Sequence, residues 1–236
     1  MILVHGLLLS REIWKNLVKT LEERKIYVKT FELPGHGKKN NVRYKSPKRI
    51  VENIKEEVNA MGCDSCILVL HSIATFLFKG ITKNDKFFKK IVLIDGNLSE
   101  KNCSVSKKVA NWEDDKIDKS ENFYKKSAHI ILKLELNSRF SFDELSGLSL
   151  GYTLFNGKTA RAIARDSLVI LNEGWIKKFV QENIFKVSLL YGYNYILPKD
   201  FPNFLTLNFL ENSKHFGMID DRVKVCNFLE ALLKDT

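Results

Sequence analysis

The chain has 236 residues, a formal net charge of +10 and a hydrophobic fraction of 44%. This length can bury the core of one modest domain that carries an insertion. No apolar run approaches the roughly 20 residues needed to span a bilayer. The lysines stand in scattered pairs, which favours a solvated surface over a nucleic-acid-binding stripe. Residues 1–9 are apolar but lack the basic region and cleavage site of a signal peptide, so we expect a cytoplasmic location.

Short apolar runs alternate with amphipathic stretches along the chain. We expect buried strands at residues 2–4, 28–31, 67–70, 91–95, 187–191 and 204–208. We expect helices at residues 14–23, 47–61, 72–81 and 221–233. Short apolar strands between helices predict the α/β class, with a mostly parallel sheet that helices cover on both faces.

The third predicted strand carries the most informative motif. Its apolar run ends in His71 and Ser72, and a helix-compatible segment follows at once. This is the strand–turn–helix context of a serine nucleophile elbow. The N–H of Ile73, at the start of the following helix, would then be one donor to a developing oxyanion.

Chemically useful residues also follow the other predicted strands. His5-Gly6 follows the first strand, and Pro34-Gly35-His36-Gly37 follows the second. Asp95 ends the fourth strand, and His215 lies in a loop before the last helix. The order Ser72, Asp95, His215 is the nucleophile–acid–base order expected of α/β-hydrolases.

With these motifs, the chain resembles an α/β-hydrolase of the single-domain esterase/lipase type over nearly its whole length. The resemblance implies that Ser72 is the nucleophile and that His215 is the base. It also implies that the N–H groups of Leu7 and Ile73 form the oxyanion hole. No hairpin precedes the first strand, so we expect a version of this fold that is trimmed at the N-terminus.

The motif departs from the family pattern at the elbow. The family usually has G-x-S-x-G, but here Leu70 and Ala74 occupy the two glycine positions. Ala74 is a mild change, whereas the bulkier Leu70 requires a gap in the neighbouring packing.

Two carboxylates are candidates for the acid of the triad. Many relatives carry it after the later strand, where Tyr193-Asn194-Tyr195 offers no carboxylate before Asp200. We assign Asp95 to orient and charge-stabilise His215, with Asp200 as the alternative acid. A further alternative is that Asp95 only caps a turn with Gly96-Asn97.

The long segment between the fourth and fifth strands is polar and rich in helix-forming residues. We expect residues 98–183 to form a helical lid, and residues 1–97 and 184–236 to form the hydrolase core. Three further histidines are given supporting roles: His71 supports the elbow, His36 structures its loop, and His5 bonds within the oxyanion loop.

These features predict a serine hydrolase that cleaves a carboxylic ester or thioester through an acyl-enzyme intermediate. Cys63 and Cys66 lack the second half of a zinc site, so we expect no metal, and the chemistry needs no organic cofactor. One alternative is a non-catalytic or weakly catalytic protein that binds a small hydrophobic ligand. Another is an enzyme whose acyl substrate is held on an acidic carrier protein, which the positive charge would attract.

Overall fold

The computed structural model describes residues 1–82, 85–136, 145, 149–150, 152–183, 186–197, 199 and 206–234. Its strands are β1 (Ile2–Val4), β2 (Lys29–Phe31), β3 (Cys66–His71), β4 (Phe88–Ile94), β5 (Val187–Gly192) and β6 (Thr206–Leu210). They form one sheet in the order β2-β1-β3-β4-β5-β6, and every neighbouring pair is parallel. The predicted parallel sheet is confirmed.

The register of the central strands brings their carboxyl ends to one edge of the sheet. Val4 is paired with Phe31 of β2 and with Leu70 of β3. Leu70 is paired with Leu93 of β4, and the next residue of β4, Ile94, is paired with Leu190 of β5. The residues that follow β1, β2, β3 and β4 therefore emerge at the same edge, where open parallel sheets bind their ligands.

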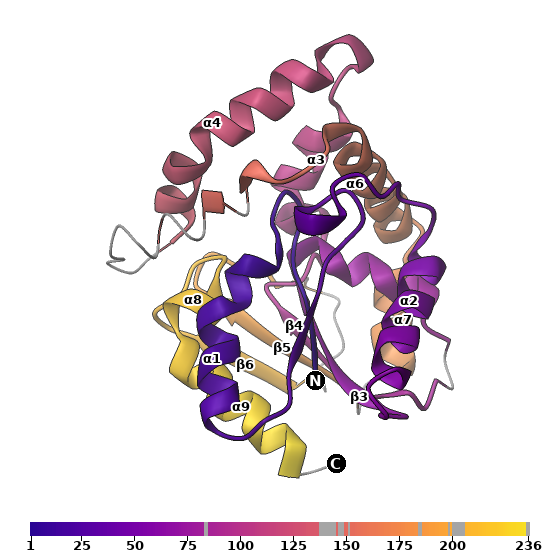
Figure 1. Cartoon of the computed structure of the whole chain (residues 1–236), viewed down its shortest axis with the longest axis vertical. Helices are drawn as coiled ribbons and strands as arrows, with labels where there is room; N and C mark the ends of the chain where they lie inside the picture. The colour runs from indigo at the N-terminus through magenta and orange to yellow at the C-terminus, as the bar shows by residue number, and fades with distance from the viewer. Residues whose placement is uncertain are drawn as a thin grey trace.

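Helices cover both faces of the sheet. Figure 1 shows α1 and α9 on one side of the strands and α2 and α7 on the other. The helices outside the β4–β5 segment are η1 (Arg11–Trp14), α1 (Lys15–Glu23), η2 (Gly37–Lys39), α2 (Pro47–Asn59), η3 (Ser72–Gly80), α8 (Gly217–Asp220) and α9 (Arg222–Lys234). None of the helices in the described residues is long and apolar enough to cross a membrane.

The segment between β4 and β5 is helical where the structure describes it. It contains η4 (Glu100–Asn102), α3 (Ser104–Ala110), η5 (Asp114–Lys116), α4 (Ile117–Glu135), α6 (Gly157–Asn172) and α7 (Trp175–Glu182). In Figure 1, α3, α4 and α6 lie at the end of the molecule away from the N-terminus, where β1 starts. They therefore lie beyond the carboxyl ends of the strands.

A backbone bridge and a ring stack are two of the contacts that tie this helical segment to the rest of the fold. His36 forms an isolated antiparallel bridge with Phe155, just before α6. Phe179 of α7 stacks on Phe78 of η3, with ring centroids 4.3 Å apart. The first contact joins the segment to the loop after β2, and the second joins it to the helix that follows the predicted elbow.

The helix that follows the predicted elbow is a 3₁₀ helix and not an α-helix. Residues 72–81 are predicted to be helical, and the structure forms a 3₁₀ helix, η3, over Ser72–Gly80. The six residues 73–78 are all buried, so the packing around η3 governs its winding more than an amphipathic pattern does. A Cβ atom on Gly80 would lie 2.7 Å from the Pro47 carbonyl oxygen, so α2 begins in close contact with the end of η3.

Candidate active site

A cavity of about 170 Å³ lies at the carboxyl edge of the sheet. Four of the five predicted site residues line it: Leu7, Ser72, Asp95 and His215. Ile73 is fully buried directly after Ser72. The remaining lining residues are Leu9, Asn97, Lys101, Asn102, Ser104, Val105, Ser106, Tyr124, Ile131, Glu135, Tyr152, Asn194, Tyr195, Lys214 and Phe216.

Ser72 stands on a sharp turn between β3 and η3. Its φ is +55°, in the left-handed region that residues other than glycine rarely adopt. Leu70 is fully buried in its strand pairing between Val4 and Leu93, and Ala74 is also buried. The elbow therefore forms although Leu70 and Ala74 replace the glycines of the family pattern.

The loop after β1 approaches this elbow closely. A Cβ atom on Gly6 would lie 3.1 Å from the Ser72 Cβ and 2.9 Å from Nδ1 of His71. Glycine at this position lets the backbone pass directly beside the serine. In the part of the chain that the structure describes, the N–H groups of Leu7 and Ile73 have no hydrogen-bond acceptor. Both N–H groups therefore have unused donor capacity near Ser72.

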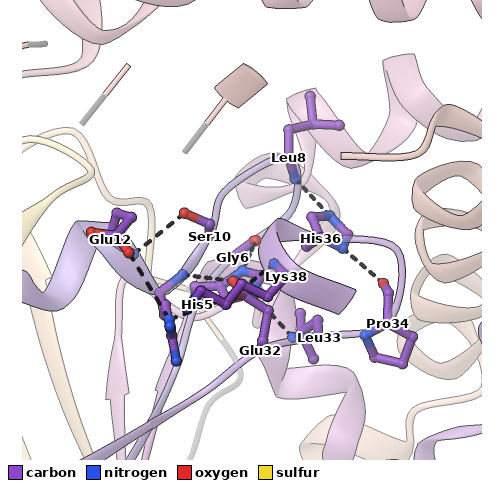
Figure 2. A network of polar contacts seen from close by, with 11 residues as sticks. His5, Gly6, Leu8, Ser10, Glu12, Glu32, Leu33, Pro34, His36 and Lys38 are labelled. Carbon is purple, nitrogen blue, oxygen red and sulfur yellow. Dashed lines mark hydrogen bonds and ion pairs between the residues drawn. The ribbon is translucent and has the colours of Figure 1, made fainter. Parts of the chain in front are cut away.

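Two buried histidines fix the shape of this loop (Figure 2). Nε2 of His36 accepts a hydrogen bond from the Leu8 N–H at 3.1 Å, and its Nδ1 donates to the Pro34 carbonyl at 2.9 Å. Leu8 has a φ of +61°, so this bond holds a strained residue directly after Leu7. Nε2 of His5 accepts from the Leu33 N–H at 3.1 Å, and its Nδ1 donates to the Gly6 carbonyl at 2.8 Å.

These contacts confirm the supporting roles predicted for His5 and His36. Burial lowers the pKa of His5 to about 4 and the pKa of His36 to about 3. Both rings are therefore neutral at pH 7, with one nitrogen donating and the other accepting.

Glu32 completes the network around the loop. Its Oε1 accepts from the Arg11 N–H at 2.8 Å, and its Oε2 accepts from the Lys38 N–H at 3.2 Å. A Cβ atom on Gly37 would lie 2.2 Å from the Glu32 carboxyl carbon. Gly37 therefore leaves room for this carboxylate, which ties the start of η1 to the loop that follows β2.

His215 lies in the loop before α8 and is partly exposed. His71 supports it: Nε2 of His71 donates to the His215 carbonyl at 3.0 Å, and the two ring centroids are 4.8 Å apart. Burial lowers the pKa of His215 to about 4, so its ring is neutral at pH 7 and able to accept a proton. Among the described residues, the His215 ring forms no hydrogen bond with Ser72 or Asp95.

Asp95 lies at the end of β4 with a φ of +46°. Its Oδ1 accepts from the Gly192 N–H at 2.9 Å, so the bond goes to β5 and not to the Gly96-Asn97 turn. Its Oδ2 is buried and has no partner among the described residues. Burial raises the pKa of Asp95 to about 8, the Gly192 bond lowers it, and the Asp220 carboxylate raises it further. Asp200 lies outside the described residues.

Asn97 is a site residue that the sequence did not single out. It is 4% exposed and lines the cavity, and its N–H donates to the Ser72 carbonyl at 3.0 Å. Glu32 directly follows β2, and Asn97 lies three residues after the end of β4. Their place after the strands is the signal that could have identified both, because such residues collect at the ligand-binding edge of a parallel sheet.

The described residues contain no group of three or more His, Cys, Asp or Glu side chains that could hold a metal ion. Cys66 is buried, and burial raises the pKa of its thiol to about 12. This thiol is therefore protonated at pH 7, which disfavours both metal binding and redox chemistry.

Comparisons with known proteins show which solved structures have a similar fold. No family model matches the chain, and no curated protein matches its sequence. Among solved structures, a thermophilic esterase from Thermogutta terrifontis has a TM-score of 0.70 at 14% identity, covering 99% of this chain and 89% of that one. The esterase EaEST from Exiguobacterium antarcticum has a TM-score of 0.69 at 11% identity, covering 99% and 91%. A structure from a study of Nitrososphaera gargenis carboxylesterases has a TM-score of 0.67 at 15% identity, covering 100% and 91%.

These matches extend over nearly the full length of each chain, and they agree with the six-stranded parallel sheet and its helices. The chain therefore has the α/β-hydrolase fold.

The raised pKa of Asp95 predicts a pH-dependent stability. Between about pH 4 and pH 8 the folded protein keeps this proton while the unfolded chain releases it, so ionisation favours unfolding as the pH rises. Asp95→Asn removes this effect. The free energy of unfolding of the variant minus that of the wild type should rise by about 1 kcal/mol for each pH unit across this range. Urea unfolding at pH 5 and pH 8 measures the difference.

Asp64→Asn is the matched control, because Asp64 is an exposed carboxylate in the loop before β3. We expect this variant to follow the wild type at both pH values. An Asp95→Asn protein that loses stability relative to the wild type as the pH rises would contradict the assignment of a protonated, buried Asp95.

Proposed function

We propose that this protein is a serine hydrolase that cleaves a carboxylic ester or thioester through an acyl-enzyme intermediate. The observation that carries the proposal is the left-handed turn at Ser72, on a cavity that Asp95 and His215 also line. The esterases with similar structures support hydrolysis of an ester as the type of reaction.

In this mechanism, His215 takes the proton of the Ser72 hydroxyl as the serine oxygen attacks the substrate carbonyl carbon. The N–H groups of Leu7 and Ile73 bind the oxyanion that forms. His215 then returns the proton to the departing alcohol or thiol, which leaves the acyl group on Ser72. A water molecule then gives a proton to His215 and attacks the carbonyl carbon of the acyl-serine ester. As the acid leaves, His215 returns that proton to the Ser72 oxygen, which regenerates the hydroxyl.

Asp95 is proposed as the acid that orients His215. Its Oδ2 is the unpartnered oxygen, and such a buried polar atom calls for an explanation. Catalytic hydrogen bonds are often long or poorly aligned without substrate and tighten in the complex. We propose that Asp95 and His215 form their hydrogen bond when substrate fills the cavity and His215 begins to take the proton.

The helices beyond the strand ends are proposed to act as the lid over this reaction, within the predicted segment 98–183. Tyr124 and Glu135 of α4 and Tyr152 line the cavity, so this segment contributes directly to its wall. The many polar lining residues favour a substrate with polar groups over the small hydrophobic ligand of the non-catalytic alternative. A thioester on an acidic carrier protein and a cytoplasmic location remain predictions from the sequence.

The nucleophile and the base are tested by two substitutions. Ser72→Ala and His215→Ala should each lower the turnover of p-nitrophenyl esters by roughly 10³-fold or more, because the members of a triad act as a unit. Circular dichroism and thermal unfolding of the purified variants check that the fold is kept. Wild-type turnover by a folded Ser72→Ala protein would exclude Ser72 as the nucleophile.

The acid is tested by a pair of matched variants. Asp95→Asn should lower turnover by orders of magnitude, because an amide favours the wrong imidazole tautomer and, unlike the carboxyl group, cannot ionise to offset the imidazolium charge that forms during the reaction. Asp200→Asn should leave turnover within a few-fold of the wild type. The reverse pattern in measured kcat values would assign the acid to Asp200.

A further inference from the structure

Asn97 is held rigidly against the candidate nucleophile. Its backbone N–H donates to the Ser72 carbonyl at 3.0 Å, and its backbone carbonyl accepts from the Thr75 hydroxyl at 3.3 Å. A Cβ atom on the preceding Gly96 would lie 2.8 Å from Cγ2 of Thr75, so the chain packs tightly on η3 here. Asn97 therefore keeps a fixed position beside the elbow.

Only the nitrogen of the Asn97 side-chain amide forms a hydrogen bond among the described residues. Its Nδ2 donates to the Ser106 hydroxyl of α3 at 3.2 Å, and Ser106 is itself buried. Its Oδ1 is buried and has no partner among the described residues. An unsatisfied buried carbonyl oxygen is costly, so a ligand that supplies a donor gains by pairing with it.

Asn97 and Ser106 both line the cavity that contains Ser72. We propose that Oδ1 of Asn97 accepts a hydrogen bond from the substrate, and that the substrate is an ester with a hydroxyl or N–H group close to its scissile carbonyl. The proposal rests on the proposed function only in taking this cavity as the substrate site. It names a feature of the substrate that the ester reaction by itself does not require.

The same contact would also exclude other esters. A substrate that lacks the donor group leaves Oδ1 of Asn97 unpaired and forgoes the free energy of that hydrogen bond. Sites built to bond a polar group reject analogues without it far more strongly than apolar pockets reject a missing methylene. Asn97 would therefore set specificity, while Ser72 and His215 carry the chemistry.

Binding to the Ser72→Ala protein tests this inference without requiring catalysis. Isothermal titration calorimetry is used to measure the affinity of ethyl butanoate and of its 2-, 3- and 4-hydroxy derivatives. We expect at least one hydroxylated ester to bind about tenfold more tightly than ethyl butanoate. The added substitution Asn97→Leu, which keeps the approximate shape of the side chain, should reduce this preference to within about twofold.

Asn111→Leu is the matched control, because Asn111 is exposed after α3 and does not line the cavity. It should keep the preference for the hydroxylated ester. Asn97→Asp, which retains an acceptor oxygen, should keep it as well. If Asn97→Leu does not fold, Asn97→Ala replaces it in the same comparison.

Equal binding of all four esters would overturn the inference, as would a preference that survives in a folded Asn97→Leu protein. These outcomes are distinct from a failure of the proposed function. Absence of ester hydrolysis by the wild type counts against the hydrolase, whereas the binding preference is measured in a protein that lacks Ser72.

Discussion

The candidate site depends on the sharp reversal of the backbone at Ser72. A non-glycine residue in the left-handed region costs on the order of 1–3 kcal/mol and persists only where its surroundings hold it. β3 is fixed between β1 and β4, and the Ser72 carbonyl accepts a hydrogen bond from Asn97. Gly6 lies directly against the serine on another side. The neighbouring strands thus stabilise the turn that presents the hydroxyl to the cavity.

Around this turn, buried polar groups fix the loops that the chemistry would use. The neutral rings of His5 and His36 hold the loop that carries the Leu7 N–H, and His71 holds the backbone of His215. Burial lowers the pKa of all four of these histidines, which keeps charge out of the loops at neutral pH. Two buried oxygens on the cavity, Oδ2 of Asp95 and Oδ1 of Asn97, have no partner among the described residues. These two oxygens can still accept a hydrogen bond from a catalytic group or a ligand.

The sequence predicted most of the parallel sheet, because short apolar strands followed by polar turns give a strong pattern. β1 and the end of β3 at Ser72 fall where that pattern placed them. The 3₁₀ winding of η3 could not be predicted, since η3 packs against α2, α6 and α7, and the last two helices lie far along the chain. The bond from His71 to the His215 carbonyl also arises only when residues 144 positions apart meet. The unpaired oxygen of Asn97 depends on which groups the fold brings beside it. The assignment of Asp95 as the acid stays a prediction.

We propose that the left-handed turn makes Ser72 an activated nucleophile. Reaction of the protein with a fluorophosphonate, followed by peptide mapping with mass spectrometry, tests it most directly, because Ser104 and Ser106 also line the cavity and serve as internal controls. We expect a single adduct on Ser72 in the wild type, much slower labelling in His215→Ala, and none in Ser72→Ala. An unlabelled Ser72, or an adduct that persists unchanged in Ser72→Ala, would contradict it.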